Sequence, residues 1–165
     1  MTIRTARPED ADQIAAFWNP LIEQTTITFT TEPKSPVAIA ADIAAKADTG
    51  LPYLALEISG RVVGFATYAQ FRGGPGYRHT MEHSIILAPE VRSAGYGRAL
   101  MQAVAAHARQ NKVHSLMAGI SGENTQAVAF HKKCGFETVG TVPQAGWKFG
   151  RWINLILMQK LIGSH

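Results

Sequence analysis

The fold of this chain is decided by one stretch, Arg92-Ser93-Ala94-Gly95-Tyr96-Gly97. It follows the apolar run Ile85-Ile86-Leu87 and leads into a helical pattern that extends from Arg98 to Gln110. The first turn of a helix leaves about four backbone N–H groups without partners, and the helix dipole adds positive potential there. The order of strand, glycine turn and helix therefore predicts an anion site, and we interpret it as a pyrophosphate cradle.

The glycines and arginines of this turn suit a phosphate ligand. Gly95 and Gly97 let the main chain approach a ligand closely, while Arg92 and Arg98 add positive charge at either end. A dinucleotide-binding turn would need a third glycine where Leu100 stands, and no G-K-[ST] follows that would make a P-loop. The remaining alternative is a glycine turn that only starts a helix.

The pattern R-x-x-G-x-G resembles the acetyl-CoA-binding signature of the GCN5-related N-acetyltransferases (GNAT). The resemblance implies an α/β fold with a mixed central sheet of about seven strands, about four flanking helices and splayed central strands. It also implies a single GNAT domain over residues 1–165 and acetyl-CoA as co-substrate. The residues that would bind acetyl-CoA are Ile85, Ile86, Leu87, Arg92, Ser93, Ala94, Gly95, Tyr96, Gly97, Arg98 and Asn124.

Composition is that of an ordinary globular protein. The chain has 165 residues, 46% of them hydrophobic, and its one cysteine, Cys134, cannot form an internal disulfide. The N-terminus lacks an apolar signal core, and no run of eighteen apolar residues occurs, so we expect a cytoplasmic protein. The net charge of +4 favours anionic ligands, but the basic residues are scattered. We expect neither a nucleic-acid nor a membrane partner, and no metal.

Hydrophobic periodicity and turn residues predict alternating elements without a long linker. Strands are expected over residues 2–7, 53–58, 62–70, 80–87, 115–120, 137–142 and 152–158. Helices are expected after Pro8, from Pro36 to Ala47, from Arg98 to Gln110 and over 125–134, with Pro20 kinking or breaking the first of them. This order indicates an α/β sandwich with a mixed sheet.

A second segment, from Gly122 to Phe136, resembles the N-x-x-[AS]-x-x-[FL]-[YH]-x-x-x-G-F segment of the same family. The side chain of Asn124 either caps the following helix or binds the pantetheine arm. His131 stands where many members carry a tyrosine that protonates the leaving thiolate. An imidazole suits that role near neutral pH, and a solvated helix histidine is the alternative.

Glu82 is our candidate for the general base. A strand has a period of two, so Glu82, Ser84 and Ile86 share one face and His83 points to the other, where we expect it to pack or to support the site. A charged side chain is unusual in a central strand that is covered on both faces, so Glu82 is expected to have a function there. The alternative is that Glu82 is an ordinary, solvent-exposed strand residue. The family resemblance implies that an amine attacks the acetyl thioester directly in a ternary complex, and Glu82 would take the ammonium proton.

Three further segments, over residues 29–33, 77–84 and 147–152, resemble the phosphinothricin and methionine sulfoximine N-acetyltransferases. That resemblance implies transfer of an acetyl group to the α-amino group of L-phosphinothricin, L-methionine sulfoximine or L-methionine sulfone. It also implies a homodimer with the site near the interface. The alternatives are an acetyltransferase for a polyamine or a protein N-terminus, and a non-catalytic acyl-CoA-sensing module.

Such an acceptor carries a carboxylate and a polar head, so its pocket should offer cations and N–H donors. The loop Arg72-Gly73-Gly74 supplies both, and a flexible hairpin with a solvated arginine is the alternative. The side chains of Trp147 and Phe149 are candidates for the apolar part of the pocket. The complete set of expected substrate-binding residues is Arg72, Gly73, Gly74, Glu82, His83 and Ser84.

Overall fold

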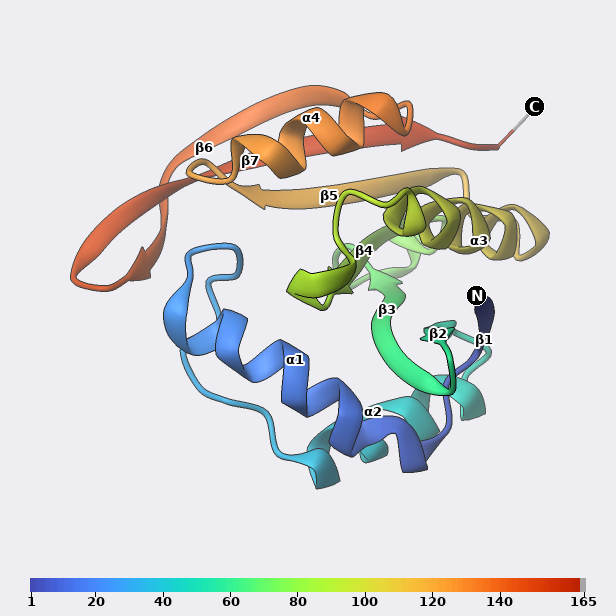
Figure 1. Ribbon diagram of the computed structural model, residues 1–165. Coiled ribbons are helices and arrows are strands. Elements are labelled where there is room, and N and C mark those ends of the chain that lie inside the picture. The colour runs from blue at the N-terminus through green and yellow to red at the C-terminus, as the bar shows by residue number, and fades with distance from the viewer. Residues whose placement is uncertain (164–165) are drawn as a thin grey trace.

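A seven-stranded mixed sheet runs through the computed structural model, which describes residues 1–163 (Figure 1). The strand order is β1-β2-β3-β4-β5-β7-β6, and every neighbouring pair is antiparallel except β4 and β5. The strands are β1 (Thr2–Thr5), β2 (Tyr53–Ile58), β3 (Arg61–Gln70), β4 (Thr80–Leu87), β5 (Ser115–Ser121), β6 (Glu137–Lys148) and β7 (Arg151–Leu161). The helices are α1 (Ala11–Gln24), α2 (Pro36–Asp48), α3 (Tyr96–Gln110) and α4 (Thr125–Lys133), with short 3-10 turns η1 (Pro8–Asp10), η2 (Pro75–Tyr77) and η3 (Pro89–Val91). These elements confirm the predicted mixed sheet of seven strands with four helices.

Helices cover both faces of the sheet. On β3, the ring of Phe65 packs against Trp18 of α1, whereas the hydroxyl of Tyr68 forms a 2.8 Å hydrogen bond with His107 of α3. Residues an odd number apart on a strand face opposite sides, so α1 and α3 lie on opposite faces. Figure 1 shows α1 and α2 together at the bottom and α4 at the top beside β6 and β7. No helix among residues 1–163 is long and apolar enough to cross a membrane.

Strands β4 and β5 separate along their length. β4 pairs with β3 from Met81 to Leu87, but it pairs with β5 only over its first three residues, Thr80 to Glu82. The rest of β4 therefore has a free edge toward β5, and this confirms the predicted splay. Main-chain groups along that edge are open to a ligand because no ladder uses them.

Helix α1 does not break at Pro20, so of the two expected outcomes, a kink or a break, the break is wrong. The helix continues to Gln24, and its last turns bury Leu21 and Ile22. A proline in a helix loses one backbone hydrogen bond, and burial of two large apolar side chains just beyond it offsets that loss. The predicted second helix is confirmed, with Ser35 as its N-cap accepting from the N–H of Ala38.

The hairpin of β6 and β7 is longer than expected. Strand patterns stopped at residue 142 and resumed at 152, because the segment around Pro143 and Gly146 looks like a loop. The register shifts between Val142 and Gly146, which places the irregular residues in a bulge within β6. Phe149 and Gly150 close the hairpin with φ of 52° and 72°, as a tight two-residue turn requires.

Candidate active site

A cavity of about 400 Å³ lies where β4 and β5 separate. Its walls come from β4, β5 and β7, from α1 and α4, and from the connection between α1 and α2. The lining residues are Trp18, Lys34, Asn124, Ala127, His131 and Leu155, together with residues 27–30, 83–86 and 118–121. Because α1 and α4 cover opposite faces, the cavity extends through the sheet from one face to the other.

The start of α3 offers a run of unused backbone donors. The N–H groups of residues 93–98 donate to no acceptor within the described chain. Ser93 and Gly95 have φ of 65° and 84°, a left-handed geometry that curves successive N–H groups into a concave nest. Gly97 has a different role, since a Cβ there would lie 3.2 Å from Leu87 and Phe130. It lets the start of α3 pack tightly against β4 and α4.

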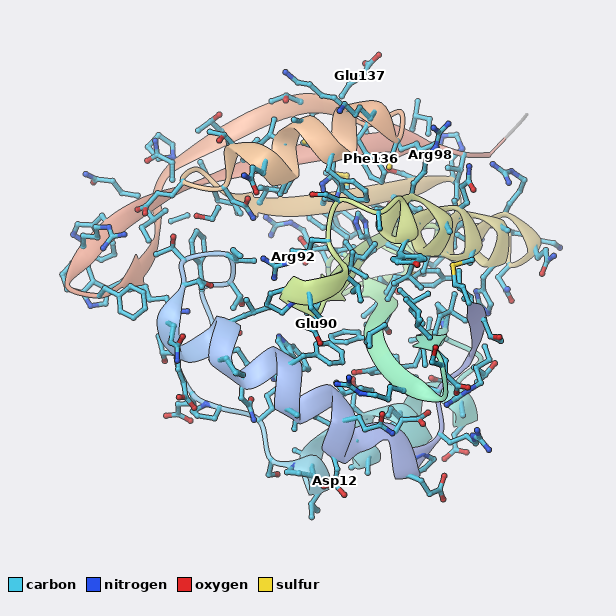
Figure 2. All side chains as sticks on the ribbon, in the orientation of Figure 1. Asp12, Glu90, Arg92, Arg98, Phe136 and Glu137 are labelled. Carbon is cyan, nitrogen blue, oxygen red and sulfur yellow. The ribbon has the colours of Figure 1, made fainter. Side chains whose placement is uncertain are left out.

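Two exposed arginines flank this nest, Arg92 before it and Arg98 within the first turn of α3. They lie on opposite sides of the turn (Figure 2). The guanidinium of Arg92 donates to the carbonyl of Leu87, 3.2 Å away, on the free part of β4. Backbone donors between two cations suit a pyrophosphate, so this geometry supports the predicted cradle, which stays a prediction.

Glu82 lies on the face of the sheet that α1 covers. It pairs with Ala69 of β3, four pairs along from Phe65, and residues an even number apart on a strand share a face. The carboxylate lies over Gly119 of β5: a Cβ at that position would be 3.1 Å from Glu82 Oε2 and 3.4 Å from Leu155. The residue is exposed toward solvent, yet partial burial among these neighbours raises the pKa of its carboxyl. A raised pKa makes this carboxylate a stronger base.

His83 points to the opposite face, as predicted, and meets His131 of α4. The two Nε2 atoms are 3.0 Å apart, and both rings contact Phe136. Both residues line the cavity while being only 6% and 5% exposed. The interpretation of His131 as a solvated helix histidine is therefore wrong.

The partners of His131 fix where its hydrogens lie. Its Nδ1 is 2.7 Å from the carbonyl of Ala127, and a carbonyl only accepts, so Nδ1 carries a hydrogen. Burial lowers the pKa of both imidazoles, and the neighbouring His131 lowers that of His83 further. In the neutral pair His83 Nε2 donates to His131 Nε2, so the pair shares one proton at this contact.

Asn124 serves as the N-cap of α4, and its side-chain oxygen accepts from the N–H of Ala127 at 3.1 Å. The residue also lines the cavity. The capping bond uses only the oxygen, so the side-chain NH₂ is the group that remains for a pantetheine carbonyl. Asn124 can therefore cap α4 and bind the pantetheine arm at the same time.

The loop Arg72-Gly73-Gly74 lies outside the residues that line the cavity. All three residues are exposed, and the guanidinium of Arg72 lies 5.5 Å from the ring centroid of Phe71. The side-chain amide of Gln70 donates to the carbonyls of Arg72 and Gly74, which braces the loop. The loop follows β3 and precedes β4, so it stands at the end of the strand pair that carries Glu82.

The two aromatic candidates on the final hairpin are about half exposed, at 52% each for Trp147 and Phe149. The ring of Trp147 packs at a tilt of 59° against its cross-strand partner Trp152, with ring centroids 4.7 Å apart. Phe149 lines a second cavity of about 320 Å³, which shares Ile27 and Asn124 with the first. Of these candidates, Phe149 thus comes nearest to the site.

Sequence reasoning missed several wall residues. Trp18 belongs to α1, and Lys34 and the segment 27–30 belong to the connection between α1 and α2, where the family resemblance covered residues 29–33 but assigned no site residue. Gly119 did carry a signal, because a glycine inside an apolar strand often marks close approach by another group. Lys148 was missed as well: it is 3% exposed and its Nζ donates to the carbonyls of Thr28 and Thr30, at 2.8 Å each.

A sheet splayed between two parallel strands, a donor nest at the following helix and a carboxylate beside the splay define an acyl-CoA-dependent N-acyltransferase. The family model described as an acetyltransferase (GNAT) domain matches residues 3–157 of this chain. The chain belongs to the GNAT acetyltransferase family, which confirms the resemblance found in the sequence.

Similar sequences cover nearly the whole chain. An L-methionine sulfoximine/L-methionine sulfone acetyltransferase of Pseudomonas paraeruginosa is 36% identical over 159 residues, which are 96% of this chain and 92% of that protein. A phosphinothricin N-acetyltransferase of Alcaligenes faecalis is 33% identical over 164 residues, 99% of this chain and 83% of that protein.

Solved structures agree with this fold. A GNAT superfamily phosphinothricin acetyltransferase from Sinorhizobium meliloti in complex with AcCoA superposes with a TM-score of 0.92 at 30% identity, covering 98% of this chain and 88% of that one. A ribosomal-protein-alanine N-acetyltransferase from Brucella melitensis has a TM-score of 0.94 at 37% identity, covering 98% and 99%. The protein is an N-acetyltransferase and acetyl-CoA is its co-substrate.

Proposed function

We propose that this enzyme transfers the acetyl group of acetyl-CoA to the α-amino group of a small amino acid such as L-phosphinothricin, L-methionine sulfoximine or L-methionine sulfone. One observation carries the proposal: the cavity passes through the splay, with the phosphate nest at α3 and Glu82 on the α1 face. The two substrates can therefore meet from opposite sides of the sheet. The names of the relatives support this acceptor class.

The chain's residues divide the chemistry between them. The nest over residues 93–98 holds the pyrophosphate, and the free edge of β4 over residues 85–87 binds the pantetheine arm and the acetyl carbonyl. Bound acetyl-CoA supplies the activated thioester. Glu82 takes one proton of the acceptor's ammonium, directly or through water, so that the nitrogen lone pair can form the new C–N bond. The C–S bond then breaks, and the nitrogen releases a second proton to water, which leaves the neutral amide.

His131 returns a proton to the leaving thiolate in this proposal. Its Nδ1–H is held by Ala127, so the proton must come from Nε2, the atom that faces His83. The pair therefore has to gain a proton from solvent in each cycle, and His83 shares the resulting charge. Water as the direct donor is the alternative, and a pH profile of His131→Gln separates the two.

Ser84 and the Arg72 loop complete the acceptor side. Ser84 is exposed on the face of Glu82 and lines the cavity. Arg72 with the amides of Gly73 and Gly74 stands at the Glu82 end of β3 and β4, where the acceptor's α-carboxylate would lie beside its amine.

We further propose a cytoplasmic homodimer. Large apolar side chains are exposed together on the hairpin of β6 and β7, namely Val139, Val142, Trp147, Phe149 and Trp152. Exposed apolar groups gathered on one element favour association, and a second copy would cover them. Cys134 has no disulfide partner, which suits a reducing compartment.

The test is release of free thiol from acetyl-CoA with phosphinothricin, methionine sulfoximine and methionine sulfone, each beside a no-acceptor control. A polyamine and peptides that begin with alanine serve as rival acceptors, the second because of the Brucella melitensis neighbour. We expect saturable release with the first three. Release only with a rival would overturn the acceptor, and cofactor binding without any release would favour the sensing module.

A further inference from the structure

Lys34 brings a full charge into the wall of the cavity. Among the described residues that line it, Lys34 alone carries a formal charge at neutral pH, since the others are apolar, hydroxyl, amide or neutral imidazole side chains. An ammonium in a largely apolar wall attracts anions more strongly than one in bulk water. The wall thus favours a ligand with negative charge.

The position of Lys34 is fixed by its neighbours. The side chain of Asn19 accepts from its backbone N–H at 2.8 Å and donates to its carbonyl at 2.9 Å. The residue is half-buried, and Nζ lies 5.2 Å from the centroid of the Trp18 ring. No carboxylate lies within 4.0 Å of Nζ within residues 1–163, so this ammonium has a ring beneath it and no anion beside it.

A second donor belongs to the same wall. Nε1 of Trp18 is buried and has no acceptor within the described part of the chain. Buried donors are normally satisfied, and an exception points to a partner that the chain itself does not supply. An oxygen group of a ligand would suit both Trp18 and Lys34.

Contacts place Lys34 away from the reacting amine. Trp18 packs on Phe65, at 4.8 Å between ring centroids, and Phe65 pairs with Ile86. Ile86 is four residues beyond Glu82 on the same face, which is roughly 13 Å along a strand. The reacting amine lies against the acetyl group, between Glu82 and Ile86, so the acceptor can turn its α-carboxylate toward the Glu82 end of β4 while its side chain extends toward Lys34.

We propose that Lys34 binds the oxygen-bearing head of the acceptor's side chain and makes the enzyme prefer heads that are anionic. This assignment rests on the proposed function and adds its specificity: amino acids with a phosphinate head over those with a neutral sulfone. Arg72 remains the candidate for the α-carboxylate at the opposite end. Lys34 and Arg72 would thus bind the two ends of the acceptor.

The test compares two acceptors that share the α-amino and α-carboxylate groups and differ in the head, L-phosphinothricin and L-methionine sulfone. Lys34→Gln should lower kcat/KM for phosphinothricin about ten-fold or more and for the sulfone no more than about three-fold. Lys34→Arg should keep most of the preference. The exposed Lys133→Gln should change neither value, and KM for acetyl-CoA should stay constant in all variants.

Three results would overturn the assignment. An equal loss of kcat/KM for both acceptors would mean that Lys34 binds a group that the two acceptors share, or that it only supports the fold. A raised KM for acetyl-CoA would place Lys34 at the cofactor, and unchanged kinetics would give it no role. If the unaltered enzyme releases thiol with neither acceptor, the proposed function is wrong and the assignment of Lys34 is wrong with it. If the unaltered enzyme is active and only Lys34→Gln loses activity, the proposed function stands.

Discussion

At the scale of single residues, neighbouring positions on β4 place the proposed base and the histidine pair on opposite faces of the sheet. Glu82 faces α1 with a carboxyl whose pKa is raised by partial burial, and His83 faces α4, where it pairs with His131. The period of two along a strand is enough to separate the proposed base from the proposed proton donor. His83 and His131 line the cavity, and Glu82 lies one residue before the stretch of β4 that lines it.

Replacing Glu82 with glutamine should lower kcat/KM by about 10²-fold to 10⁴-fold, the usual contribution of a positioned base. Because burial raises the pKa of Glu82, kcat/KM of the unaltered enzyme should fall as pH drops through that raised value, where the carboxylate becomes protonated. The variant should lack this acidic limb and bind acetyl-CoA normally. A Glu82→Gln enzyme with unchanged rates across pH would rule Glu82 out as the base.

At the scale of elements, the final hairpin holds the connection that forms one wall of the cavity. Lys148 of β6 donates to the carbonyls of Thr28 and Thr30, and the ring of Phe29 packs so tightly on Gly146 that a Cβ there would lie 2.7 Å away. Arg151 binds Glu123, which in turn accepts from Thr26. The wall is thus fastened at several points.

Lys148→Met should loosen this wall without touching the phosphate nest. The partly buried carbonyls of Thr28 and Thr30 lose their donor, so we expect KM for the amino acid to rise about ten-fold and KM for acetyl-CoA to stay constant. Hydrogen exchange over residues 26–31 should become faster than in the exposed control Lys133→Met. Unchanged exchange in that segment would contradict the proposed fastening.

The corner between β1, η1 and β2 is held by one ion-pair network. Arg4 binds Asp10 at 2.8 Å and Glu57 at 2.8 Å, and Asp10 also accepts from the N–H of Arg7. The hydrogen bonds from Arg4 hold the pKa of Asp10 below its ordinary value of 3.8. The stabilisation is therefore complete above the unfolded pKa and is lost as pH falls through the lower folded value.

Asp10→Asn keeps the shape of this corner but removes one charge from it. We expect the free energy of unfolding at pH 7 to fall by about 1–3 kcal/mol. The difference from the unaltered protein should shrink in strong acid, where Asp10 is protonated in both states. Denaturant titrations at pH 7 and in acid measure this, and an equal difference at both pH values would contradict it.

At the scale of the whole molecule, local signals predicted the sheet and the nest but not the acceptor wall. The strand over residues 80–87 was predicted to the residue, because alternation, Pro89 and Gly95 all act within a few positions. Lys34 and Trp18 meet β4 only after about fifty residues of intervening chain have folded, and no local pattern encodes such a contact. The second half of β6, around Gly146, was not predicted for a similar reason. This irregular segment is a strand only because it pairs with β7, and that pairing is not visible in the local sequence.

Assembly can be tested on the apolar strip of the final hairpin. We expect light scattering to give about twice the 17.9 kDa mass of one chain, and Trp152→Glu to give a single chain with unchanged circular dichroism. The charge would be buried against a second copy at a large cost. A monomeric unaltered protein, or a variant that stays dimeric, would contradict this interface.

The central claim is that acetyl-CoA and the amino acid meet in the splay between β4 and β5 and react directly. Initial rates over a grid of acetyl-CoA and L-methionine sulfone concentrations test it most directly. The account predicts reciprocal plots that intersect, because both substrates must be bound before acetyl transfer. Parallel lines, together with acetylated protein detected by intact mass after acetyl-CoA alone, would contradict it.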